Sequence, residues 1–182
     1  MKSIFKKSFK VTQTYNSSHK GLDMVGIGDI DVISPINGTV KSSTVIVDKS
    51  NITWEWGNYI RVDDSSGNRY FFCHLKSRSV TVGDKIKAGD KLGVMGNTGK
   101  SYGAHCHFEI RDSSNTRKNP ADFLEIPNTI ATYKNGWVKE NGYWYYYQDN
   151  KLYKGFLKVG SKVYFLDSTG KLIITDKDGE II

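Results

Sequence analysis

The sequence contains few cysteines, few prolines and no long apolar run. Its 182 residues include two cysteines, three prolines and four histidines. Two cysteines are too few for a disulfide scaffold, and we expect Cys73 and Cys106 to be reduced and buried as small hydrophobes. No stretch approaches the roughly 18 apolar residues that span a bilayer, so we expect no membrane insertion. The first ten residues also contain no apolar segment of signal-peptide length, which predicts a chain made in the cytoplasm without a signal peptide.

The charge balance excludes few classes of function by itself. The formal net charge is +7, but the lysines and arginines are scattered along the chain. Nucleic-acid binding proteins usually gather such charges on one face or along one helix, and no segment here does so. We therefore expect no nucleic-acid partner, whereas an anionic polymer of another kind would still attract the protein at long range.

The first two thirds of the chain have the pattern of a mainly β, antiparallel domain. Short apolar runs alternate with glycine-containing turns, and helical periodicity is almost missing. The predicted strands are residues 31–33, 38–47, 56–63, 68–75, 91–95 and 105–111, with turns at 64–67 and 96–99. A linker is expected around residues 125–128, so we place the first domain at 1–127.

The remaining residues, 128–182, differ in composition and repeat themselves. From Tyr133 onward the tail holds 11 of the 23 aromatic residues. Residues 136–139 are echoed by 155–158, and 144–147 by 163–166, at an offset of 19 residues in both cases. This period predicts a small module of β-hairpin repeats that bury their faces against one another. A third, incomplete hairpin is expected at 175–181.

All four histidines lie in contexts that could belong to a metal site. His19 and Asp23 are four residues apart, and the serines and glycine around them argue against a helix that would bring them together. On a straight strand they would be about 13 Å apart. A bent loop, which Gly21 permits, is then the way for them to converge.

The other three histidines belong to predicted strands. Strand alternation puts His105 and His107 on one face and Cys106 on the other. The same alternation separates Cys73 from His74, so three imidazoles would line one concave face if the strands pair. A lone strand histidine is usually a surface or core residue. A set of imidazoles with a carboxylate and an open position is, however, what a catalytic zinc site requires.

Several segments, in their order along the chain, resemble the lysostaphin-type zinc endopeptidases of peptidoglycan. HKGLD at 19–23, VMGNTGKS at 94–101 and GAHCHFE at 103–109 carry the resemblance. PINGTV at 35–40 and VGDKIKAGD at 82–90 are also similar, and the match spans about residues 11–124. Ala104 departs from the family's pattern, since many relatives have proline there, but this change removes no functional group.

The resemblance implies a role for each residue of the site. It implies that His19, Asp23 and His107 bind one Zn²⁺ per chain, with water or substrate in the fourth position, and that His74 and His105 are catalytic. The histidine that acts as general base is left open, with His105 the favoured one. The implied reaction is hydrolysis of peptide bonds in the stem or cross-link of peptidoglycan.

The tail resembles the choline-binding type of wall-anchoring repeat, whose aromatic side chains form cages for quaternary ammonium groups. The expected wall-ligand residues are Trp137, Trp144, Tyr145 and Tyr164. The resemblance implies peptidoglycan and wall polymers, choline-bearing ones among them, as partners. Because two repeats are few, a homodimer through the repeats is a further expectation.

Two alternatives belong to other classes of function. One is a catalytically inactive relative that binds wall or activates another enzyme, and the presence of all five site residues disfavours it. The other is a pure wall-adhesion protein, which would leave the histidines unexplained. A wall hydrolase without an export signal also suggests a phage endolysin that acts after phage-induced release. A phosphate-binding loop at 96–101 is excluded because Val94 stands where the pattern needs glycine.

Overall fold

The computed structural model describes residues 2–45 and 54–174, in which the chain forms two compact units, residues 1–132 and 133–182. The expected boundary at 127/128 lies a few residues before this division. Each unit is mainly β, as predicted. No helix among the described residues has the length and apolar character needed to cross a membrane.

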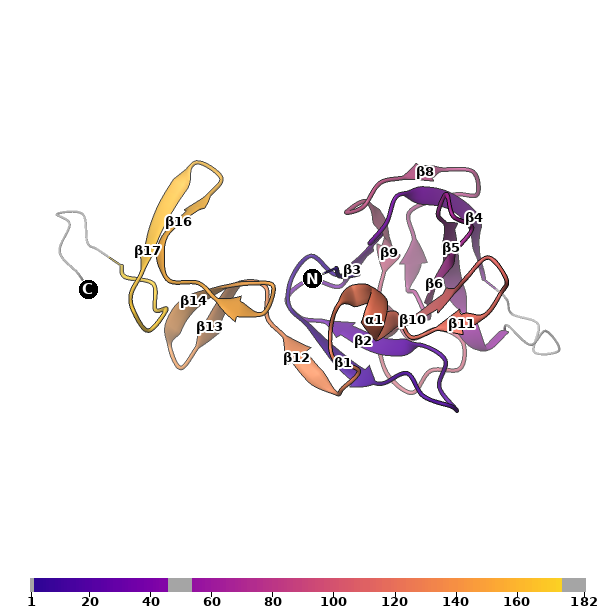
Figure 1. Cartoon of the computed structure of the whole chain (residues 1–182), viewed down its shortest axis with the longest axis horizontal. Coiled ribbons are helices and arrows are strands. Elements are labelled where there is room, and N and C mark those ends of the chain that lie inside the picture. Colours follow the sequence, from indigo (N-terminus) through magenta and orange to yellow (C-terminus); the bar gives the residue numbers. More distant parts are fainter. Residues whose placement is uncertain (1, 46–53, 175–182) are drawn as a thin grey trace. The chain divides into compact units, whose positions relative to one another are not determined.

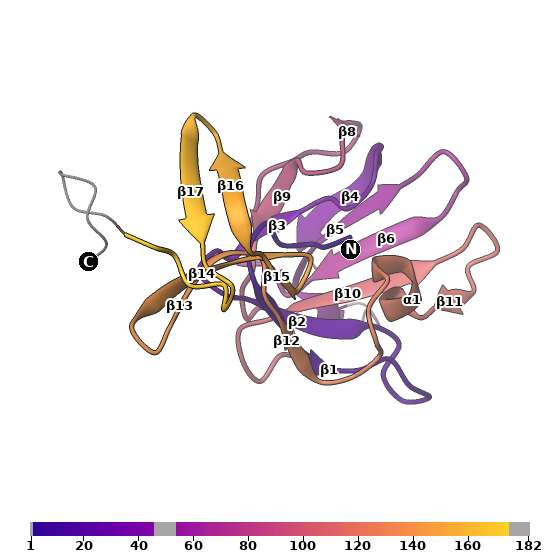
Figure 2. The ribbon, with the colours of Figure 1, turned by 60° about the vertical axis from the view of Figure 1, so that its left-hand side comes forward.

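The described part of the first unit is organised by one large sheet. Figure 2 shows its central strands side by side. The order is β12-β1-β2-β10-β6-β5-β4-β8, with β11 paired to β10. The bounds are β12 (Ala131–Tyr133), β1 (Phe9–Gln13), β2 (Leu22–Gly26), β10 (Cys106–Arg111), β6 (Arg69–Cys73), β5 (Asn58–Asp63), β4 (Gly38–Val45), β8 (Lys85–Ile86) and β11 (Arg117–Lys118).

A second, smaller sheet and two short helical segments complete this unit. The small sheet has the order β3-β9-β7, with β3 (Asp31–Ile33), β9 (Lys91–Val94) and β7 (Ser77–Arg78). A 3₁₀ turn, η1 (Trp54–Trp56), precedes β5, and the helix α1 (Pro120–Leu124) lies over β10 in Figure 1. Phe123 of α1 contacts Phe108 of β10, with ring centroids 6.5 Å apart.

The alternation of apolar side chains explains why the central strands form. In β2, Leu22 and Met24 are fully buried while Asp23 between them is partly exposed. In the antiparallel neighbours β10 and β6, Phe108 lies opposite Phe72, and their rings are 5.2 Å apart. One face of the sheet therefore forms the apolar core, and the side chains between the core residues are directed to the other face.

Most predicted strands are confirmed, with bounds that differ by at most two residues where the structure describes them. Residues 31–33 form β3, and the turn at 64–67 connects β5 to β6. The prediction for 38–47 extends beyond the described residues at its end. The helix α1, which was not predicted, directly precedes the expected linker at 125–128, and Asn119 caps it by accepting a hydrogen bond from the backbone N–H of Ala121 at 3.1 Å.

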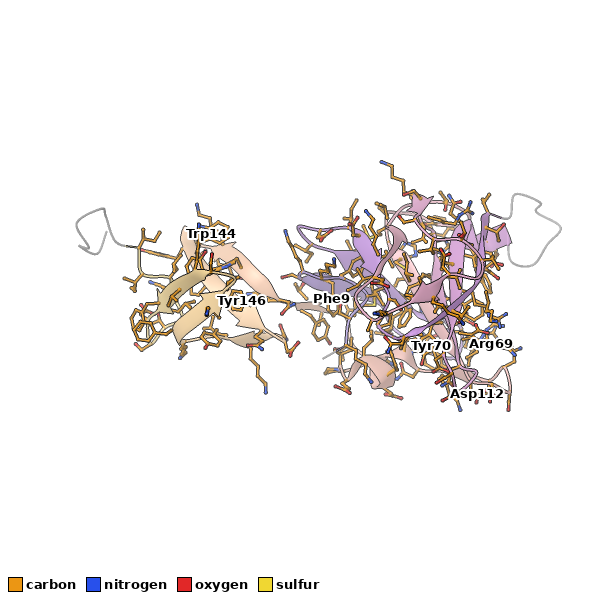
Figure 3. The ribbon with its side chains drawn as sticks, turned by 90° about the horizontal axis from the view of Figure 1, so that it is seen from above. Phe9, Arg69, Tyr70, Asp112, Trp144 and Tyr146 are labelled. Atoms are coloured by element: carbon orange, nitrogen blue, oxygen red, sulfur yellow. The ribbon has the colours of Figure 1, made fainter. Side chains whose placement is uncertain are left out.

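The described tail consists of hairpins, as the 19-residue repeat predicts. The strands β13 (Gly136–Glu140), β14 (Tyr143–Gln148) and β15 (Lys151–Leu152) form one sheet, and β16 (Gly155–Val159) and β17 (Lys162–Leu166) form another. Figure 3 shows Trp144 and Tyr146 among the side chains of this unit. Ring contacts join the hairpins, with the centroids of Trp137 and Tyr164 4.8 Å apart. The expected third hairpin lies outside the described residues.

Both cysteines are free thiols in the core. Cys73 and Cys106 have no exposed surface, and burial raises the pKa of each thiol. Protonated, inaccessible thiols react slowly, because the thiolate is the nucleophile. We expect neither thiol to react with Ellman's reagent in the folded protein and both to react after addition of denaturant. A thiol that reacts in the folded protein as fast as in the unfolded chain would contradict this packing.

Candidate metal centre and catalytic cleft

The pairing of β2 with β10 sets Asp23 directly opposite His107. Side chains at directly opposed positions of an antiparallel pair lie close together on the same face. Accordingly, Asp23 Oδ1 is 2.9 Å from His107 Nδ1. The neighbouring positions, Met24 and Cys106, are also opposite each other and are buried on the core face. The sheet register alone therefore brings a carboxylate and an imidazole together on the partly exposed face.

His19 joins this pair from the loop that precedes β2. The side chain of Asn16 accepts hydrogen bonds from the backbone N–H groups of Ser18 and His19, which holds the loop in a tight turn. His19 Nε2 lies 3.1 Å from Asp23 Oδ1 and 3.1 Å from His107 Nδ1. Three ligand atoms thus converge on one point.

Gly21 enables this convergence for a different reason from the expected one. We expected it to permit a bend, but its φ lies outside the left-handed region. A Cβ at this position would instead come within 2.6 Å of the His107 ring and 2.7 Å of the Phe108 carbonyl oxygen. The loop needs glycine here because the imidazole of His107 occupies the space that a side chain would fill.

His74 follows β6 in a left-handed conformation, with φ of 63°. The predicted strand 68–75 therefore ends earlier than expected, and alternation does not orient this side chain. A non-glycine residue in this region costs on the order of 1 kcal/mol. Hydrogen bonds offset the cost: the backbone N–H donates to the Trp56 carbonyl at 2.8 Å, and Nδ1 lies 2.8 Å from the Thr98 carbonyl oxygen.

His105 lies just before β10 and completes the cluster. Its Nδ1 is 2.8 Å from the Gly103 carbonyl oxygen, and its Nε2 is 3.5 Å from Asp23 Oδ1. The rings of His74 and His105 are 4.7 Å apart, and those of His74 and His107 are 6.0 Å apart. The structure therefore brings all five residues predicted for the site together.

The hydrogen bonds of the outward nitrogens orient three of the four imidazoles. Nδ1 of His19 faces the Thr14 carbonyl oxygen at 2.9 Å, in the same way that carbonyl oxygens face Nδ1 of His74 and His105. A carbonyl oxygen only accepts, so Nδ1 carries the proton in each neutral ring and Nε2 has a free lone pair. Each of the three rings, when neutral, thus has an unprotonated Nε2 on the side away from the backbone carbonyl.

The electrostatics of the cluster favour an anionic Asp23. Burial would raise the pKa of its carboxyl, but hydrogen bonds from His107 and His19 outweigh burial and hold that pKa far below its ordinary value. Burial also opposes charge on His107, yet its hydrogen bond with Asp23 and the nearby carboxylate of Glu109 raise the pKa of the imidazole to about 9. For His74, burial is the largest effect and lowers the pKa to about 4, so this ring is neutral at neutral pH.

His19, Asp23 and His107 fit a zinc ion by chemistry and by spacing. Their facing atoms are 2.9–3.1 Å apart. Two ligands of a tetrahedral ion with bonds of about 2.0–2.1 Å would be roughly 3.3 Å apart, so small shifts suffice. Among the described residues, these three form a group whose possible ligand atoms all lie within 4.8 Å of one another, as a metal site requires. Both cysteines lie on the core side of the sheet.

A cleft of about 670 Å³ opens over the cluster. Thr12, Gln13 and Val25 line it from β1 and β2, and the loop 100–104 lines it opposite. This loop is fixed at its base, because Lys100 donates hydrogen bonds to Glu55 through both its backbone N–H and its Nζ. Glu55 was not identified from the sequence as a residue of the cleft. The feature that could have indicated it is its position between two tryptophans.

A second cavity, of about 290 Å³, lies within the tail unit. Trp137, Trp144, Tyr164 and Leu172 line it. Three of the four expected wall-ligand residues therefore meet there. Tyr145 does not, because it follows Trp144 on the same strand and alternation directs it to the other face of the hairpin. Leu172 was not expected, since an aliphatic side chain gives no signal for such a site.

Comparison with protein families identifies both parts of the chain. Residues 17–120 match peptidase family M23. Residues 135–150 and 154–172 match a putative cell wall binding repeat. The first match covers all five residues of the histidine cluster, and the second covers all four aromatic residues expected to bind a wall ligand.

Several similar proteins are named as endopeptidases. The glycyl-glycine endopeptidase ALE-1 of Staphylococcus capitis is 31% identical over 134 residues, and the peptidoglycan DD-endopeptidase ShyC of Vibrio cholerae is 30% identical over 98 residues. These alignments cover 69% and 53% of this chain but only 35% and 22% of the relatives' own length. The catalytic domain of lysostaphin from Staphylococcus simulans has a similar structure, with a TM-score of 0.54 and 26% identity, over 66% of this chain and 92% of that domain.

Replacement of Gly21 by alanine tests the packing of the metal centre. The added methyl group would displace His107, since the Phe108 backbone blocks its other side. We expect Gly21→Ala to lower the affinity for zinc by roughly 10-fold or more, as displaced ligands do. In the control Gly103→Ala, the Cβ meets nothing within 4 Å, and affinity should stay within about twofold. Equal affinities of the two variants, measured by competition with a chelator, would contradict this packing.

Proposed function

Because the chain belongs to peptidase family M23, we propose that it is a zinc-dependent endopeptidase that hydrolyses peptide bonds in the stem or cross-link of bacterial peptidoglycan. The observation that carries this proposal is the convergence of His19, Asp23 and His107 beneath a cleft that also contains His74 and His105. When bound, zinc supplies a Lewis acid for the scissile carbonyl and lowers the pKa of a water molecule.

The two remaining histidines divide the work of proton transfer and orientation. We assign His105 as general base because its Nε2 lies 3.5 Å from Asp23, next to the proposed ligands. With Nδ1 held by the Gly103 carbonyl, this Nε2 accepts the proton of the attacking water and then returns it to the leaving amine. His74, neutral and held by Thr98, uses its own Nε2 to accept a hydrogen bond from the water or from the substrate amide.

The tail unit retains the enzyme on the wall in this proposal. Trp137 and Tyr164 present aromatic faces on one cavity, and such faces attract quaternary ammonium groups through cation–π interaction. Choline-bearing wall polymers are therefore the proposed ligand. At the positions 19 residues later, Phe156 replaces Trp137 and Val163 replaces Trp144, and both are exposed. The described repeats thus form one such cavity.

Two wider aspects belong to the same proposal. The exposed side chains of Phe156, Val163 and Phe165 on the second hairpin support a homodimer through the repeats, because they leave apolar surface uncovered within the described chain.

The combination of a wall hydrolase with a wall-binding unit supports the role of a phage endolysin. Mass spectrometry of digested walls from candidate hosts would identify the bond that is cleaved.

Two histidine variants test the catalytic proposal. His107→Ala removes one ligand of three, so we expect loss of stoichiometric zinc together with activity. His74→Ala leaves the ligands intact, so we expect zinc to be retained while cleavage of a cross-linked wall peptide falls by about 100-fold or more. Zinc content and cleavage are measured on the same preparations. Full zinc retention in His107→Ala would contradict the ligand assignment, and a metal-free wild-type chain without activity would favour the inactive relative.

The repeat offers a matched pair of variants for wall binding. Trp137→Ala removes a wall of the cavity, and we expect roughly 10-fold weaker binding to choline-bearing walls, since one such contact contributes about 1–2 kcal/mol. Phe156→Ala is the equivalent change in the second hairpin, outside this cavity, and should weaken wall binding by much less than Trp137→Ala does. Pull-down on purified walls, with and without free choline, is the measurement. Equal losses in both variants would reject the cavity as the site, and indifference to choline would reject only this ligand.

A further inference from the structure

Glu109 is a buried carboxylate that the proposed reaction does not use. It lies in the middle of β10, and 3% of its surface is exposed. Oε1 accepts hydrogen bonds from Arg111 Nε and, at 3.3 Å, from Arg117 Nε. Oε2 lies 3.8 Å from His107 Nε2, the ring nitrogen that faces away from Asp23 and His19. The carboxylate therefore stands between a proposed zinc ligand and an arginine.

The orientation of His107 differs from that of the other three imidazoles. Those rings direct Nε2 into the site, and backbone carbonyl oxygens at 2.8–2.9 Å hold their Nδ1 atoms. His107 directs Nδ1 into the site, so Nε2 is its outward nitrogen. The charged group beside this nitrogen is the Glu109 carboxylate. A side chain thus takes the place that a backbone carbonyl holds for the other rings.

Strand geometry explains why Glu109 can reach both partners. Residues 107, 109 and 111 alternate onto the same face of β10. The guanidinium of Arg111 lies over the ring of Phe71, 4.9 Å from its centroid, and 5.6 Å from that of Trp56. Arg111 is thereby held in place, and it offsets the cost of burying the Glu109 charge.

We propose that Glu109, held by Arg111, is a positioning residue for His107 in the metal centre. Its carboxylate faces the Nε2–H of the imidazole at 3.8 Å, and this electrostatic contact favours the proton on Nε2, which leaves the lone pair on Nδ1 and directs the ring toward His19 and Asp23. A carboxylate behind a histidine ligand also makes that ligand more basic, and loss of such a partner commonly weakens metal binding by roughly 10–100-fold. This inference rests on the proposed zinc site.

A second carboxylate–arginine pair in the same sheet provides a matched control. Arg61 and Asp63 are also two residues apart on one strand, β5, and Arg61 Nε donates to Asp63 Oδ1 at 2.7 Å. Arg61 likewise lies over the Phe71 ring, at 5.9 Å. This pair has the chemistry of Glu109 and Arg111, but no hydrogen bond or ion pair joins it to a histidine within the part of the chain that the structure describes. Asp63→Asn therefore reproduces the loss of charge without the loss of a partner for His107.

The experiment compares Glu109→Gln with Asp63→Asn in the full chain. The zinc dissociation constant is measured by competition with a chelator, the thermal stability on the metal-free protein, and the ligand field from the visible spectrum after loading with Co²⁺. We expect Glu109→Gln to weaken zinc binding by roughly 10-fold or more and to alter the Co²⁺ spectrum. Asp63→Asn should change neither, even where both variants lower the stability of the metal-free chain.

Each alternative outcome has a distinct meaning. Unchanged zinc affinity and an unchanged Co²⁺ spectrum in Glu109→Gln would overturn the proposal and leave Glu109 as part of a structural ion pair. If this variant does not fold because Arg111 lacks its partner, the double variant Glu109→Gln/Arg111→Gln removes both charges, and the same criteria apply to it. A wild-type chain that binds no zinc would instead contradict the proposed function itself.

Discussion

The site depends on one constraint, the register of the β2–β10 pair, which sets Asp23 opposite His107. This register also buries Leu22, Met24, Cys106 and Phe108 on the core face, so a slip by one residue would expose the core and bury the carboxylate. The register that stabilises the sheet is therefore also the register that the proposed metal centre requires. The remaining parts of the site are attached to this pair: His19 through the preceding loop, and His105 at the first residue before β10.

The opposite wall of the cleft is held by backbone contacts. Gly57 and Gly99 have positive φ, and a Cβ on either would come within 2.4 Å of backbone atoms of the other segment. This close approach brings the Thr98 carbonyl to His74, and the Thr98 hydroxyl accepts from Asn58 and donates to the Leu75 carbonyl. The left-handed His74 is stabilised by this packing, so the side chain that we propose to act in catalysis is oriented before any substrate arrives.

Sequence patterns predicted the strands well, because alternation is a local property that residues 58–63 display clearly. They also predicted which residues gather at the site, through the resemblance of its motifs. The way in which His19 and Asp23 converge could not be derived, since it depends on Gly21 yielding space to a ring 86 positions away in the chain. The helix α1 was missed although Asn119 and Pro120 are a typical helix start. Tyr145 was grouped with its aromatic neighbours, although alternation separates it from Trp144.

The central claim is that one zinc ion is held by Asp23 and His107, which the β2–β10 register brings together, and by His19 from the preceding loop. Anomalous diffraction at the zinc absorption edge, on crystals of the full chain grown with one equivalent of zinc, tests it most directly. The account predicts a single strong peak within bonding distance of His19 Nε2, Asp23 and His107 Nδ1, with His74 and His105 beside it but not bound. A peak coordinated by other residues, or by His105 in place of His107, would contradict it.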